Sequence, residues 1–99
     1  MARLIEFSRR STSQLQKILT FYDERNDSDA YSRRLLSCLL EDISQLAITP
    51  TASSPPTRPD VRFFYLMGFT IVFRYNSRRI TILSIRSSLR KPLKIYKKE

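Results

Sequence analysis

The side chains of this chain that could do chemistry are mainly those of arginine and lysine, and their surplus charge lies in its last part. The 99 residues include 18 Lys and Arg against 9 Asp and Glu, which gives a formal net charge of +9. Residues 1–60 carry equal numbers of both signs, whereas residues 61–99 carry ten cations and the single acid Glu99. This asymmetry favours a polyanion or an acidic protein as the partner of the second part.

Other kinds of site chemistry are not supported by the residue types. The chain has no histidine, and its one cysteine, Cys38, lies in an apolar run beside Leu36, Leu39 and Leu40. Without a histidine to activate it, Cys38 is interpreted as a small core residue. Zinc sites need several Cys or His ligands, so we expect no metal, and we also expect no cofactor and no small-molecule substrate. A lone cysteine excludes an internal disulfide framework and fits a reducing compartment.

Length and hydropathy predict one domain with no membrane partner. At 41% hydrophobic and 27% charged residues, the composition is that of a single globular domain, residues 1–99. No apolar stretch reaches the roughly 18 residues that a membrane-spanning helix needs. Met1–Phe7 is too short and too charged for a signal peptide, so we expect a cytoplasmic protein.

The elements that position the basic residues begin with a strand and a helix. Arg3–Phe7 reads as a short strand. Ser11 is the expected N-cap of the first helix, with Gln14 as its capping-box partner. Asn26 and Asp27 end the helix. Its apolar residues follow the spacing i, i+3, i+4, i+7, and they are Leu15, Ile18, Leu19 and Tyr22.

A second helix follows after a very short link. Ser28 or Asp29 is its expected N-cap. Its apolar stripe consists of Tyr31, Leu35, Leu39, Ile43 and Leu46. Because so short a link favours antiparallel packing, we expect a helix hairpin over about residues 11–47.

The basic part reads as a sheet. Residues 49–60 hold four of the five prolines and are expected to form a loop. After it the apolar period changes to two, which predicts three strands joined by turns at Met67-Gly68 and Asn76-Ser77-Arg78. These strands are Val61–Leu66, Phe69–Tyr75 and Ile80–Ile85. The last is apolar on both faces and is therefore expected in the middle of the sheet. Leu93–Tyr96 reads as an edge strand or a tail.

These elements predict an α+β fold of two layers. An N-terminal strand and an antiparallel helix hairpin precede a three-stranded antiparallel meander. The helix hairpin has to cover the apolar face of the sheet, because no other element is available to do so. Within that core we expect three phenylalanines, Phe63, Phe69 and Phe73.

Three stretches of the chain, in this order, resemble a known family. The first is LIEFSRRSTSQLQKILTFYDER, and the second is YSRRLLSCLLEDISQL followed by the Pro-rich loop. The third, VRFFYLMGFTIVFRYNSRRITILSIRSSLRKP, is similar to a family pattern of Val-Arg, a Gly-aromatic turn, an Ile/Val-Phe/Tyr-Arg strand and an Arg-x-Pro end. The family is the RelE/ParE superfamily of bacterial type II toxin–antitoxin toxins.

The resemblance implies a small toxin that is neutralised by a cognate antitoxin protein. RelE-like members cleave mRNA on the ribosome, whereas ParE-like members poison DNA gyrase. In the RelE-like alternative, Arg90 matches a phosphate-stabilising arginine and Tyr96 a tyrosine that stacks on a base or assists acid–base transfer. The nucleases place paired lysines where this chain has Val61 and Phe63, and an arginine where it has Thr70.

The loss of three cations removes most of the charge that RNA cleavage needs around the phosphate, so the ParE-like reading is favoured. The basic residues then form an antitoxin-binding or target-binding surface, and the candidates are Arg62, Arg74, Arg78, Arg79, Arg86 and Lys91. A further alternative is a non-toxic domain that binds nucleic acid through these cations and interleaved aromatic residues.

Overall fold

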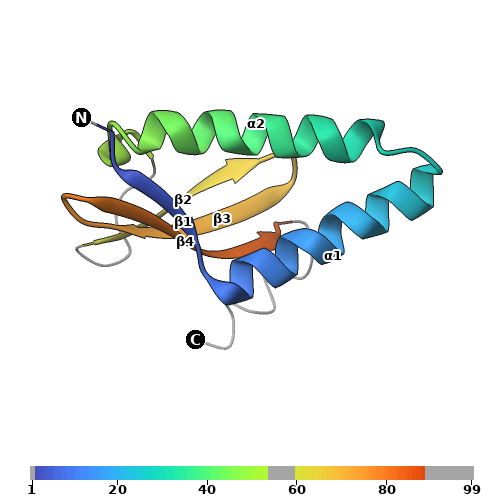
Figure 1. The fold of residues 1–99 in the computed structure, drawn as a ribbon, viewed down its shortest axis with the longest axis horizontal. Helices are drawn as coiled ribbons and strands as arrows, with labels where there is room; N and C mark the ends of the chain where they lie inside the picture. Colours follow the sequence, from blue (N-terminus) through green and yellow to red (C-terminus); the bar gives the residue numbers. More distant parts are fainter. Residues whose placement is uncertain (1, 54–59, 89–99) are drawn as a thin grey trace.

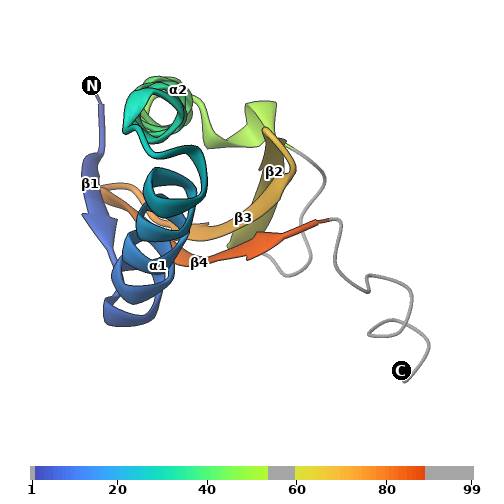
Figure 2. The ribbon, with the colours of Figure 1, turned by 90° about the vertical axis from the view of Figure 1, so that its right-hand side faces the viewer.

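The computed structural model describes residues 2–53 and 60–88. A strand, β1 (Leu4–Phe7), precedes two helices, α1 (Arg9–Asn26) and α2 (Ala30–Leu46), and a short 3-10 helix at Pro50–Ala52. Three strands follow, β2 (Val61–Leu66), β3 (Phe69–Tyr75) and β4 (Arg79–Ser87). They form a sheet of order β1-β4-β3-β2, in which β1 runs parallel to β4 and the other neighbours are antiparallel. Both helices cover the same face of this sheet (Figures 1 and 2).

This architecture confirms the expected two-layer α+β fold. The helix hairpin, the meander and the central position of the last strand are as predicted, since β4 lies between β1 and β3. None of the helices within the described residues is long and apolar enough to cross a membrane.

The first helix begins three residues earlier than expected. Its N-cap is Ser8, whose hydroxyl accepts a hydrogen bond from the Ser11 amide at 3.0 Å. Ser11 lies inside the first turn and is fully buried, where its hydroxyl donates to the carbonyl of Ile82 at 2.9 Å. The predicted cap at Ser11 was therefore wrong, because this hydroxyl serves the sheet and not the helix terminus. The predicted end is confirmed, with Asp27 in the left-handed conformation at the C-cap.

The second helix packs its apolar stripe as predicted. Leu35, Leu39, Ile43 and Leu46 are all buried. Asp29 is the N-cap, but its side chain makes no capping hydrogen bond. The Ala30 amide donates instead to the Ser28 hydroxyl at 3.1 Å. This stripe meets the helix-facing side of the sheet in one core, whose buried sheet residues are Phe69, Ile71, Phe73, Ile80, Ile82 and Ile85.

A β-bulge explains why β4 looks apolar on both faces. Phe73 pairs with Ile82, but Val72 pairs with Ser84, so Leu83 is an extra residue in β4. In a regular strand Ile82 and Ile85 would point to opposite faces. The bulge returns Ile85 to the helix-facing side, where it is 4% exposed.

The pairing of β2 with β3 corrects the expected core position of Phe63. In β2, Phe64 pairs with the buried Ile71, whereas Phe63 pairs with Val72. Neighbouring partners in a sheet share a face, so Phe64 faces the helices and Phe63 faces away from them. We call the side of the sheet without helices the outer face.

Two tight turns join the three strands of the meander, β2, β3 and β4. Met67 and Gly68 both have positive φ, 50° and 88°, as two-residue hairpin turns of the primed type require. At the other end, the Asn76 side-chain oxygen accepts hydrogen bonds from the amides of Arg78 and Arg79 at 2.7 and 2.8 Å, which closes the predicted turn.

Arg3 ties three elements together at one end of the molecule. Its guanidinium donates to the carbonyls of Ala47 and Ile48, at the C-terminus of α2, and to that of Asn76 in the β3–β4 turn. It also lies 5.5 Å from the centre of the Tyr75 ring. A cation that satisfies the last carbonyls of a helix is favoured by the helix dipole as well as by hydrogen bonding.

Replacement of Arg3 with methionine is expected to lower the free energy of unfolding by about 1–3 kcal/mol, since carbonyls at the helix end lose a charged donor. Urea denaturation measures this value. The matched control is Arg10→Met, because the Arg10 side chain is exposed on α1 and has no hydrogen bond or ion pair to any described residue. Equal stabilities of the two variants would show that Arg3 does not connect these elements.

Candidate functional site: the outer face of the sheet

Five of the predicted binding residues lie within the described part of the chain, and they do not form one patch. Arg74, Arg79 and Arg86 belong to the outer face, and Arg78 lies in the β3–β4 turn. Arg62 pairs with the buried Phe73 and is half-buried on the helix-facing side. Arg90, Lys91 and Tyr96 lie outside the described residues.

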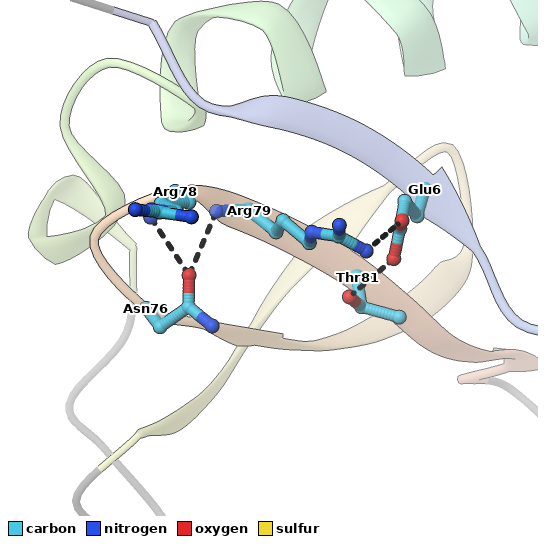
Figure 3. A network of polar contacts seen from close by, with 5 residues as sticks. All are labelled: Glu6, Asn76, Arg78, Arg79 and Thr81. Atoms are coloured by element: carbon cyan, nitrogen blue, oxygen red, sulfur yellow. Dashed lines mark hydrogen bonds and ion pairs between the residues drawn. The ribbon is translucent and has the colours of Figure 1, made fainter.

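Arg79 is neutralised by an acid from the start of the chain. Its guanidinium donates to a Glu6 carboxylate oxygen at 2.6 Å, and the Thr81 hydroxyl donates to the other oxygen at 3.4 Å (Figure 3). Glu6 is brought there because β1 pairs with β4 and aligns Glu6 with Thr81. The Arg78 side chain lies in the turn and makes no ion pair with any described residue.

Arg74 is also paired. Its guanidinium lies 3.5 Å from the Asp60 carboxylate, which stands just before β2. Both side chains are about half exposed, at 53% and 51%, so the pair adds little stability. It still reduces the positive charge that this part of the outer face presents to a partner.

Arg86 is different, because its side chain has no hydrogen-bond or ionic partner in residues 2–53 and 60–88. It is exposed on the outer face and aligned with Thr70 on β3, which is in turn aligned with Tyr65 on β2. Tyr65 is 65% exposed. Its ring meets that of Phe63 edge to face, with the ring centres 5.4 Å apart. The Thr70 hydroxyl shares a 2.7 Å hydrogen bond with Ser88.

These four residues, Phe63, Tyr65, Thr70 and Arg86, are called the aromatic–arginine row below. Sequence reasoning found Arg86 but missed the two aromatic residues, since Phe63 was assigned to the core and Tyr65 to no site. The alternation of side chains within VRFFYL could have shown which of these residues face away from the helices. The two faces could not be told apart, because consecutive aromatic residues leave both of them apolar.

The three positions that depart from the nuclease pattern also belong to the outer face, spread along β2 and β3, and Val61 among them is buried. Val61 is aligned with Arg74, Phe63 with Val72, and Thr70 with Arg86. None of the three carries a charge. Within the described residues no cluster of His, Cys, Asp or Glu could hold a metal ion. Among its described residues, the outer face presents the exposed Tyr65 ring and the Arg86 guanidinium, which has no described partner.

Comparison with known proteins agrees with this architecture. A family model described as the ParE toxin of the type II toxin–antitoxin system parDE matches residues 5–92. No curated protein sequence matches the chain significantly.

Three solved structures share the fold. A chain of the chromosomal ParDE toxin–antitoxin system from P. aeruginosa superposes with a TM-score of 0.70 at 20% identity, covering 87% of this chain and 96% of that chain. A double mutant of the E. coli toxin RelE in the free state gives 0.61 at 15% identity, with 96% and 93% covered. The E. coli DinJ–YafQ toxin–antitoxin complex gives 0.53 at 13% identity, with 89% and 94% covered. The chain belongs to the family of ParE toxins of type II toxin–antitoxin systems.

Proposed function

We propose that this toxin stops growth by poisoning DNA gyrase, and that the outer face of its sheet makes the contact with the target. The family match and the shared fold establish a type II toxin. They do not choose between the two activities, because ParDE and RelE proteins both superpose on the chain. The choice depends on the residues of the outer face.

The observation that carries the proposal is the scarcity of free cations among the described residues of this face. Metal-free RNA cleavage needs several cations around the phosphate as negative charge develops in the transition state. Here Val61, Phe63 and Thr70 are uncharged, and Arg74 and Arg79 are engaged by Asp60 and Glu6. Among the described outer-face residues, this leaves Arg86 as the arginine without an ionic partner.

The same composition supports a protein as the target. Binding energy in protein interfaces is concentrated in aromatic and arginine side chains that can be fully desolvated on contact. The aromatic–arginine row has this character, with an exposed Tyr65, a ring contact to Phe63 and a free Arg86. The affinity of a general nucleic-acid binder depends on the number of phosphates that its cations neutralise. Because Arg74 and Arg79 are already paired with acids, the outer face gives less support to that function.

A cognate antitoxin is the second partner that we propose. The P. aeruginosa ParDE and E. coli DinJ–YafQ structures are of toxin–antitoxin systems. An acidic segment of such a partner would complement the basic part of this chain, residues 61–99.

A direct assay separates the two activities. Purified toxin is mixed with gyrase, ATP and supercoiled plasmid, and cleaved DNA is measured after denaturation. In parallel, an mRNA is followed during translation in a purified ribosomal system. We expect toxin-dependent DNA cleavage by gyrase and intact mRNA. Loss of mRNA without DNA cleavage would overturn the proposal and support the RelE-like alternative. If neither DNA cleavage nor loss of mRNA were observed, the chain would have neither toxic activity, and the proposal would also fail.

A further inference from the structure

The polar side chains at the start of α1 contact the backbone of β4. β1 ends at Phe7, and the last backbone bond on this side of β4 runs from the Ser8 amide to the Ile82 carbonyl at 2.9 Å. β4 itself continues to Ser87. Its C-terminal half therefore has no neighbouring strand on this edge within the described residues.

Helix α1 takes the place of the missing strand. The Ser8 hydroxyl donates to the Leu83 carbonyl at 3.1 Å, and the Ser11 hydroxyl to the Ile82 carbonyl at 2.9 Å. One turn further on, the Gln14 side-chain oxygen accepts the Ile85 amide at 2.8 Å. A spacing of three keeps these residues on one side of the helix. Figure 1 shows α1 passing beside the end of β4.

These contacts surround the bulge that orients the end of β4. Leu83 is the extra residue, Ile85 returns to the core, and Arg86 consequently points to the outer face beside Thr70. A one-residue change of register moves every later side chain to the opposite face. Of these contacts, the one nearest to Arg86 is the hydrogen bond that the amide of the preceding residue, Ile85, donates to the Gln14 side-chain oxygen.

We propose that Gln14 is a positioning residue, which sets the direction of Arg86 by holding the Ile85 amide. The part of this inference that concerns potency rests on the gyrase-directed function proposed above. Gln14 is half-buried on the helix-facing side, so it acts on the target only through β4. The potency of the toxin thus depends on a residue of α1, a helix that does not contribute to the outer face.

The test is a double-mutant cycle of Gln14→Leu and Arg86→Ala, read out as the toxin concentration that gives half-maximal DNA cleavage by gyrase. Gln14→Leu removes the acceptor of the Ile85 amide and leaves a side chain of similar size. We expect about a tenfold loss of potency, which corresponds to the free energy of one charged or buried hydrogen bond. In the Arg86→Ala background the same change should cost less than about twofold, because the group that Gln14 positions is gone.

Two variants control for folding. Gln14→Glu keeps an acceptor of the same reach and should stay within about twofold of the parent. Gln16→Leu makes the same change on the exposed side of α1, where the side chain has no described partner, and should have no effect. An equal loss from Gln14→Leu with and without Arg86 would overturn the proposal in favour of a purely structural role.

A second measurement does not depend on the target. Nuclear Overhauser contacts between the Arg86 side chain and the Thr70 methyl group, and exchange of the Ile85 amide, report the geometry directly. We expect the contacts to weaken and the amide to exchange faster in Gln14→Leu but not in Gln14→Glu. Unchanged contacts would overturn the positioning role. If the parent toxin leaves gyrase untouched, the proposed function fails while this measurement still decides the role of Gln14.

Discussion

Reversal of the charge at Arg86 is expected to reduce the potency of the toxin in the proposed gyrase-dependent DNA cleavage by at least about 100-fold. This factor corresponds to about 2.7 kcal/mol of binding energy, which is within the usual range for an arginine at the centre of an interface. Arg86 is suited to that role because its guanidinium is exposed and has no partner among the described residues, whereas Arg74 and Arg79 already have acids. Arg86→Glu also repels any carboxylate of the partner. The toxin concentration that gives half-maximal DNA cleavage by gyrase measures the effect.

The matched control for this prediction is Arg34→Glu. Arg34 is an exposed residue of α2, on the other layer of the molecule, and its side chain has no described partner. The change in net charge is identical, so a loss caused only by weaker electrostatic attraction would appear in both variants. We expect a loss below about threefold for Arg34→Glu, in keeping with a distant surface charge. If Arg86→Glu left both potency and antitoxin affinity unchanged, the outer face would not be the binding surface.

Truncation of Phe73 to alanine is expected to lower the free energy of unfolding by about 3–5 kcal/mol. Phe73 is 0% exposed and lies between the rings of Phe64 and Tyr75, with ring centres 6.1 and 6.3 Å away. Its removal leaves a cavity where the helix stripe meets the sheet. For a domain of this size the total stability is about 5–15 kcal/mol, so the loss is a large part of the whole. Urea denaturation followed by circular dichroism measures it.

Phe63→Ala provides the contrast on the opposite face of the same sheet. Phe63 is half-buried and contacts Tyr65 on the outer face, so its loss should cost less than about 1.5 kcal/mol of stability, because less apolar surface leaves the interior. We expect it instead to weaken the proposed poisoning of gyrase, since the Phe63 ring contacts Tyr65. A stability loss as large as that of Phe73→Ala would show that Phe63 belongs to the core and that the assigned faces are wrong.

The helices and turns were predictable because they depend on local spacing. The stripe of α2, from Leu35 to Leu46, repeats every three or four residues, and that period belongs to a helix alone. Met67-Gly68 was predictable for a similar reason, because the two-residue turn needs positive φ values and glycine reaches them without strain. Neither feature depends on a distant part of the chain.

The start of α1 was not predictable in this way. Ser8 and Ser11 both fit the pattern of an N-cap, and the propensity of serine for a cap is the same at either position. The choice is made by β4, since only a start at Arg9 brings the Ser11 hydroxyl to the Ile82 carbonyl and Gln14 to the Ile85 amide. These bonds join residues more than 70 positions apart.

The sequence by itself determined the two-layer α+β class, the order of the elements and the location of the surplus charge in residues 61–99. Periodicity and composition are properties of the chain as written, so no tertiary contact is needed to read them. Only the tertiary structure decided which cations stay free. β1 pairs with β4 and brings Glu6 to Arg79, and the entry into β2 brings Asp60 to Arg74, while no described acid reaches Arg86. The number of charged residues can be read from the sequence. Which of them form ion pairs depends on distances of a few Å between side chains, and these distances are set by the fold.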